Sequence, residues 1–108
     1  MVPQVEKEIK NLFGKSTKDY KDYLLYLASQ LKIVEDASDH LTEYPFEQLK
    51  TKGADLFRIK SKSKRKNARV IYCYWKDDKI VLLCAFEEKS SSDYENSIRV
   101  AIDRFKHL

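Results

Sequence analysis

The sequence predicts an α+β domain in which helices pack on an antiparallel sheet of three or four strands. Three observations lead to this fold class. Apolar residues recur at helical spacing up to Leu41, fall into strand-like runs between residues 57 and 86, and return to helical spacing after Ser92. A length of 108 residues is that of one domain, so residues 1–108 are expected to fold as a single unit.

Helical periodicity dominates the chain up to Pro45. Apolar residues spaced by three and four positions define two amphipathic segments, residues 4–13 and residues 17–42. Gly14 suits a left-handed helix end, and the hydroxyl residues that follow it suit an N-cap. No helix breaker interrupts residues 17–42, so one long helix and two shorter ones both remain open. The stretch FEQLK after Pro45 can add one more helical turn.

From Phe57 onward the pattern is that of strands. Apolar and basic residues alternate over residues 57–60, as in a half-buried strand. The runs ARVIYCYW and KIVLLCAF are rich in β-branched and aromatic residues and are separated by KDDK, which predicts a hairpin. Both runs are apolar at successive positions, so we expect the sheet to be covered on both faces. Ser92 and Glu95 then form a capping-box pattern at the start of a last helix.

The two cysteines of the chain are expected to be buried free thiols. A hairpin turn centred on residues 77 and 78 places Cys73 opposite Leu82, with Cys84 as a diagonal neighbour roughly 7–8 Å away. That separation disfavours a disulfide. Neither cysteine belongs to a CxxC or Cys/His cluster, so the sequence predicts no metal and no cofactor.

The apolar segments also bear on where the protein acts. No apolar run approaches the about 18 residues of a transmembrane helix. The first 13 residues lack the basic start and the apolar block of a signal peptide. We therefore expect a cytoplasmic protein that has no membrane partner.

Positive charge gathers in one segment. Residues 58–69 carry +7 without a single acid, whereas the whole chain carries +4, so the remainder carries −3. Such a local excess is typical of an anion-binding patch, although a solvated lysine-rich loop would look the same. Four cations in this segment are expected to bind the RNA backbone: Lys62, Lys64, Arg65 and Lys66.

The strand register predicts where the other cations lie. A symmetric connection after residue 60 places Lys60 opposite Arg69, with Arg58 on the same face. Two opposed like charges destabilise a sheet unless an anion fits between them, and a phosphate is the natural candidate. Glu88, diagonal to Arg69, is either a structural ion-pair partner or a proton acceptor. Aromatic residues nearby, Tyr94 among them, offer stacking surfaces for a base or else pack in the core.

The strand region of the sequence also resembles a known protein family. LFRIKSKSKRKNARVIYCYWKDDKIVLLCAF, followed by a polar turn and a helix, resembles the sheet core of the RelE/ParE superfamily of bacterial toxins. It is most similar to the phage-derived HigB-like branch, over about residues 49–108. The chain has Cys84 where HigB-like relatives have a histidine, and Glu88 then Lys89 where they have a lysine pair.

The resemblance implies the toxin of a type II toxin–antitoxin system, a metal-independent and ribosome-dependent mRNA endoribonuclease that inhibits translation. Its partners would be the ribosome, mRNA and a cognate antitoxin, expected to be a helix-turn-helix protein. By this likeness the catalytic residues would be Arg58, Lys60, Arg69, Lys89 and Tyr94. The missing histidine and lysine pair support an alternative, a non-catalytic binding module of the same fold. Such a module would block gyrase, or be a decayed toxin that still binds its antitoxin.

Overall fold

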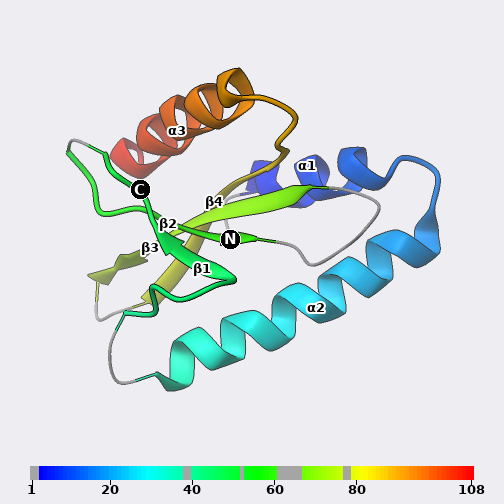
Figure 1. The fold of residues 1–108 in the computed structure, drawn as a ribbon, viewed down its shortest axis with the longest axis horizontal. Helices are drawn as coiled ribbons and strands as arrows, with labels where there is room; N and C mark the ends of the chain where they lie inside the picture. Colours follow the sequence, from blue (N-terminus) through cyan, green and yellow to red (C-terminus); the bar gives the residue numbers. More distant parts are fainter. Residues whose placement is uncertain (1–2, 38–39, 52, 61–66, 77–78) are drawn as a thin grey trace.

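The computed structural model describes residues 3–37, 40–51, 53–60, 67–76 and 79–108. Two N-terminal helices, a four-stranded antiparallel sheet and a C-terminal helix follow one another along the chain (Figure 1). The predicted α+β class is therefore confirmed. No helix of the described residues is both long and apolar enough to cross a membrane.

The helical half consists of α1, Pro3–Phe13, and α2, Thr17–Asp36. Gly14 between them has φ of 56°, a left-handed conformation that glycine adopts without steric cost. Ser16 caps α2, since its Oγ accepts a hydrogen bond from the backbone N–H of Asp19 at 3.3 Å. The open question over residues 17–42 is settled as one helix of 20 residues that stops at Asp36.

The sheet runs in the order β1–β2–β3–β4, where β1 is Phe46–Gln48, β2 is Phe57–Lys60, β3 is Ala68–Trp75 and β4 is Lys79–Glu87. The helical turn expected after Pro45 is wrong, because these residues form the edge strand β1. Backbone hydrogen bonds to β2 hold it: Lys60 N–H donates to Pro45 O and Leu49 N–H donates to Leu56 O, both at 2.8 Å. Pairing with a neighbouring strand overrides the local pattern here.

Most of the predicted register is confirmed. Lys60 lies opposite Arg69, and Arg69 lies opposite Phe86. The predicted pairing of β3 with β4 is wrong from Tyr72 to Trp75, because it shifts by one residue between Ile71 and Tyr72, so that Cys73 faces Val81 and not Leu82. A β-bulge of this kind leaves no mark in the hydrophobic pattern. Both cysteines are buried and free, as predicted.

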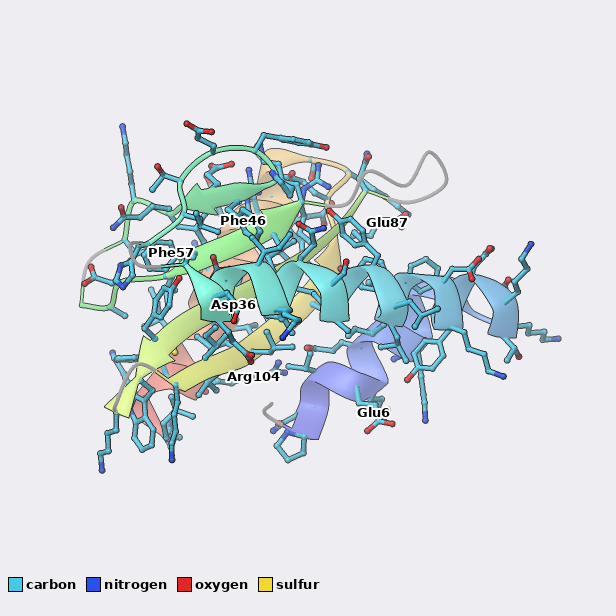
Figure 2. The ribbon with its side chains drawn as sticks, turned by 90° about the horizontal axis from the view of Figure 1, so that it is seen from below. Glu6, Asp36, Phe46, Phe57, Glu87 and Arg104 are labelled. Atoms are coloured by element: carbon cyan, nitrogen blue, oxygen red, sulfur yellow. The ribbon has the colours of Figure 1, made fainter. Side chains whose placement is uncertain are left out.

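Helices cover the sheet on both faces, as the two-sided apolar strands predicted. Figure 2 looks onto α2, which lies across the strands with Phe46 and Phe57 on its side of the sheet. The cluster on that face also takes in Val5 and Ile9 of α1. The opposite cluster packs against α3, Ser91–Lys106, around the buried Ala101.

The start of α3 differs from the prediction. The capping residues are Ser90 and Asp93, not Ser92 and Glu95. The Asp93 carboxylate accepts hydrogen bonds from the backbone N–H groups of Lys89 at 2.8 Å and Ser90 at 3.1 Å. The helix thus begins two residues earlier than the Ser92 pattern indicated, and Tyr94 of its first turn packs against the sheet.

Candidate functional site

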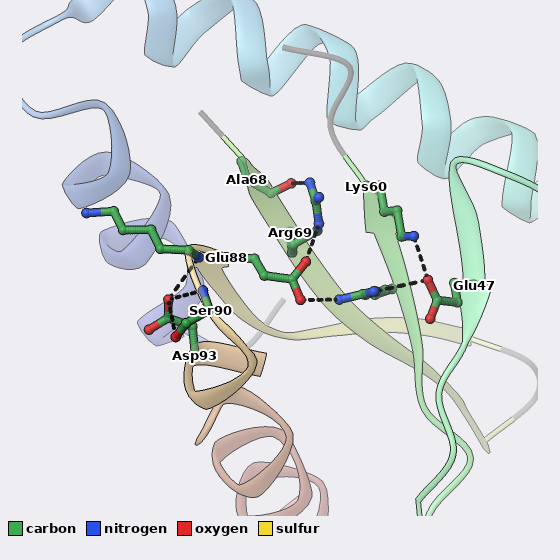
Figure 3. Close-up of polar contacts among 9 residues, drawn as sticks. Glu47, Lys60, Ala68, Arg69, Glu88, Ser90 and Asp93 are labelled. Carbon is green, nitrogen blue, oxygen red and sulfur yellow. Dashed lines mark hydrogen bonds and ion pairs between the residues drawn. The ribbon is translucent and has the colours of Figure 1, made fainter. Parts of the chain in front are cut away.

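Five charged side chains form a continuous chain of ion pairs on the face of the sheet that α3 covers (Figure 3). We call these five residues the charge network, and they follow one another in the order Lys60, Glu47, Arg58, Glu88, Arg69. They come from all parts of the sheet: β1, β2, β3 and the segment directly after β4. Three cations and two carboxylates leave the network with a formal charge of +1.

Strand alternation explains why these residues share a face. Their neighbours in sequence, such as Phe46, Ile59 and Val70, point to the opposite face and belong to the core under α1 and α2. Side chains at odd and even positions of a strand lie on opposite faces, so each network residue on β1, β2 and β3 is flanked by core residues that point the other way.

Arg58 is the centre of the network and its most buried member, with 9% of its side chain exposed. Its Nε and Nη2 donate to Glu47 Oε2 at 3.3 and 3.1 Å, and its Nη1 donates to Glu88 Oε2 at 3.1 Å. Its guanidinium carbon lies 4.7 Å from the centre of the Tyr94 ring. A planar guanidinium has enough donors to serve two carboxylates and stack on an aromatic ring at once.

The two opposed cations, Lys60 and Arg69, are each paired with a different carboxylate. Lys60 Nζ lies 2.9 Å from Glu47 Oε2. Arg69 Nε donates to Glu88 Oε1 at 3.2 Å, and its Nη1 donates to the carbonyl of Ala68 at 3.1 Å. The repulsion expected from their direct opposition is therefore offset inside the protein by the two carboxylates. Glu88 is expected from the sequence to be either an ion-pair partner of Arg69 or a proton acceptor, and the structure contains the ion pair.

The environment sets the protonation of two members of the site. Burial alone would raise the pKa of Glu47, but hydrogen bonds from Lys60 and Arg58, and their charges, hold it below its ordinary value. Burial raises the pKa of Tyr94, and the nearby Arg58 charge only partly opposes this. At neutral pH the site therefore combines an ionised carboxylate with a protonated phenol.

A family model for phage-derived Gp49-like proteins (DUF891) matches residues 12–106. The chain belongs to this family. Gp49-like proteins are a RelE-like family of toxin–antitoxin systems, which gives the chain a toxin-like role at the level of the family. No curated protein and no solved structure matches the chain significantly.

Within this Gp49-like chain, the residues expected to act together are only partly brought together. Arg58, Lys60 and Arg69 meet in the charge network, and Tyr94 lies against Arg58. Lys89 does not join them, because its exposed amine lies 3.4 Å from Glu87. The four expected RNA-binding cations lie outside the described residues: Lys62, Lys64, Arg65 and Lys66.

Cys84, at the position of the histidine in HigB-like relatives, offers no replacement chemistry. The residue is 2% exposed, and its thiol donates to the Ser97 carbonyl at 3.5 Å. Burial raises the pKa of Cys84 to about 12, so the thiol stays protonated at neutral pH. Among the described residues, no group of three or more His, Cys, Asp or Glu residues is placed to hold a metal ion.

Glu47 is the member of the site that the sequence analysis missed. It lies in the stretch FEQLK, where no alternation of apolar and polar residues marks a strand. The available signal was indirect: two cations on one face of a short strand, Arg58 and Lys60, call for a carboxylate on whichever strand pairs with it. The position of Glu47 opposite Arg58 meets that requirement.

Proposed function

We propose that this protein is the toxin of a type II toxin–antitoxin system and a HigB-like, ribosome-dependent mRNA endoribonuclease. The observation that carries the proposal is the meeting of Arg58, Lys60 and Arg69 on one sheet face beside Tyr94, in a chain of a RelE-like family. Such a face has the parts that phosphodiester cleavage needs, namely cations fixed by strands, a carboxylate and an aromatic ring.

The exposure of the three cations supports a different proposed role for each. Lys60 and Arg69 have 29% and 14% of their side chains exposed, whereas Arg58 has 9%. Lys60 and Arg69 are thus expected to contact the phosphate and to stabilise the charge that develops when the 2′-oxygen attacks it. Arg58, behind them, holds both carboxylates in place. The Tyr94 ring packs against Arg58, and its hydroxyl stays protonated at neutral pH.

The partners follow from the same surface. Toxins of this class are kept inactive by an antitoxin, and we propose a helix-turn-helix protein whose acidic residues pair with Lys60 and Arg69. The ribosome and its mRNA are the proposed targets, so the protein would act in the cytoplasm. A small helix-turn-helix reading frame next to the gene would support this assignment.

A non-catalytic binding module is the second candidate, and the pairing of all three cations with carboxylates favours it. A site whose charge is already offset attracts a phosphate less strongly than one with three free cations. The buried thiol of Cys84 adds to this, because it supplies no acid or base. Such a module would block gyrase or keep only the binding of its antitoxin.

Substitution of Arg69 distinguishes the nuclease from the binding module. Because Glu88 and the Ala68 carbonyl hold its guanidinium in place, Arg69→Ala should lower the cleavage of a translated message, mapped by primer extension, by about 10²–10³-fold. Arg69→Lys should restore only part of it, since an ammonium cannot form two parallel hydrogen bonds to a phosphate. Arg99→Ala, which removes an exposed arginine of α3, serves as the control.

Melting temperatures of the same variants show whether a loss of cleavage comes from a loss of folding. Lost cleavage in an Arg69→Ala protein that still melts cooperatively supports the nuclease. Full cleavage by that folded variant, or growth arrest by the wild type without any cut in the message, favours the binding module.

A further inference from the structure

Glu47 differs from the other carboxylate of the charge network in how its oxygens are used. Among the described residues, the polar contacts of Glu47 with Arg58 and Lys60 all go to its Oε2. Within the described part of the chain, Glu47 Oε1 accepts no hydrogen bond. Glu88 is the opposite case, because each of its oxygens accepts from a different arginine, Arg58 or Arg69.

The position of Glu47 also makes it the more accessible carboxylate. It lies on β1, the edge strand, and 37% of its side chain is exposed, against 24% for Glu88. It contacts Lys60, which is the most exposed of the three cations. An RNA phosphate that reaches Lys60 therefore comes within a few ångströms of Glu47.

From these contacts we propose that Glu47 is the general base of the reaction and takes the proton from the attacking 2′-hydroxyl. This inference rests on the proposed nuclease function and names a residue that the likeness to RelE-type toxins did not supply. Glu88, by contrast, is a positioning residue that holds Arg58 and Arg69.

The step balances without a metal or any other reactant. The 2′-oxygen bonds to phosphorus as its proton passes to Glu47, and the bond between phosphorus and the 5′-oxygen breaks. The leaving 5′-oxygen takes a proton from water, and Glu47 returns its own proton to the hydroxide that this leaves. The products are a 2′,3′-cyclic phosphate and a 5′-hydroxyl.

Binding of the substrate makes Glu47 a better proton acceptor than it is in the free protein. The groups that face it are Arg58 and Lys60 of β2, Tyr94 of α3 and, beyond Arg58, Glu88. The two cations hold its pKa down in the free protein. A phosphate that takes hydrogen bonds from Lys60 and adds a negative charge nearby raises that pKa toward the working pH.

Glu47→Gln tests the assignment, since the amide keeps the size of the side chain and an oxygen that can accept from Lys60 but cannot take a proton. Cleavage should fall about 10²–10⁴-fold. Binding to ribosomes carrying a message with a 2′-deoxynucleotide at the cleavage site should be equal or tighter, because a negative charge is gone. The wild-type rate should drop toward acid pH, and the glutamine variant should lose this dependence.

Two further variants complete the experiment. Glu43→Gln removes a charge from the exposed segment just before β1 and should leave cleavage unchanged. Glu47→Asp keeps a carboxylate and should cleave faster than Glu47→Gln, which a purely structural loss does not explain.

Three results would overturn the assignment. If Glu47→Gln binds more tightly and cleaves as fast as the wild type, Glu47 only competes with the phosphate for Lys60. If the variant loses binding or its melting transition together with cleavage, its role is structural. If the wild type itself cleaves no message, the proposed nuclease function fails, and the assignment of Glu47 falls with it.

Discussion

At the scale of single residues, the charge network shows how a sheet face can carry three cations and stay folded. A buried arginine is costly unless its charge is paired, and Arg58 is paired on both sides, with Glu47 and with Glu88. The same carboxylates offset Lys60 and Arg69, which would otherwise repel one another across β2 and β3. The ion pairs hold each cation in one orientation, and they lower the net charge of this face of the sheet.

This pairing predicts how stability depends on pH. The pKa of Glu47 in the folded protein lies below its value of about 4.5 in the unfolded chain. The carboxylate therefore contributes stability that is fully present above that value and is lost as the pH falls through the folded pKa. Melting temperatures measured from pH 7 down to about pH 3 should fall less steeply for Glu47→Gln than for the wild type.

The exposed Glu43→Gln variant is the matched control for this comparison and should follow the wild-type curve. Parallel curves for Glu47→Gln and the wild type would mean that Glu47 gains no stabilisation from Arg58 and Lys60.

At the scale of secondary-structure elements, local sequence patterns predict the strands whose own residues favour them. They do not predict a strand that forms only because it pairs with a neighbour. The β3–β4 hairpin was predictable because its strands are long and rich in β-branched residues. The edge strand β1 was not, because its three residues carry no alternation and are placed by β2. Since β1 carries Glu47, the missed strand is also why the candidate site was predicted with its cations but without one carboxylate.

Two smaller misses have the same cause. The segment 90–95 contains two overlapping capping patterns, one that begins at Ser90 and one at Ser92. Spacing alone does not distinguish them, and the structure uses the one that begins at Ser90. The β-bulge that moves Cys73 opposite Val81 likewise cannot be predicted from spacing, because it leaves the apolar pattern of β3 and β4 unchanged.

The contact between α1 and β4 offers an element-scale prediction. Glu8 of α1 accepts a hydrogen bond from the backbone N–H of Ala85 on the edge strand β4 at 3.1 Å, and pairs with Arg104 of α3 at 2.8 Å. Glu8→Ala should leave that N–H without an acceptor. We expect the Ala85 amide to exchange its hydrogen about tenfold faster or more, with a lower melting temperature.

Glu8→Gln keeps an oxygen that can accept from Ala85 and should show a smaller effect. Glu6→Ala, which removes only an exposed pair with Lys10 on the same helix, should leave the exchange of Ala85 unchanged. Equal exchange in all three variants would show that α1 does not protect this edge of the sheet.

At the scale of the whole molecule, the basic segment 58–69 divides into two parts with different physical roles. Arg58, Lys60 and Arg69 are paired with carboxylates, so the charge network is close to neutral seen from a distance. The remaining excess of positive charge in the segment belongs to residues 62–66, which lie outside the described residues. Long-range attraction to RNA should therefore come from these cations, and orientation at the phosphate from the charge network.

The division predicts that charge removal in the two parts has different consequences. The quadruple change to glutamine at residues 62, 64, 65 and 66 should weaken ribosome or RNA binding and flatten its dependence on salt. The slope of log K against log salt should fall by up to about 3, since each lost contact with single-stranded RNA removes about 0.7. At low salt and saturating protein, this variant should cleave far better than Arg69→Ala.

A matched control removes four exposed lysines elsewhere: Lys7, Lys18, Lys21 and Lys79. An equal loss of slope in the control would show that attraction depends on total charge, and an unchanged slope in the quadruple variant would return residues 62–66 to a solvated surface loop.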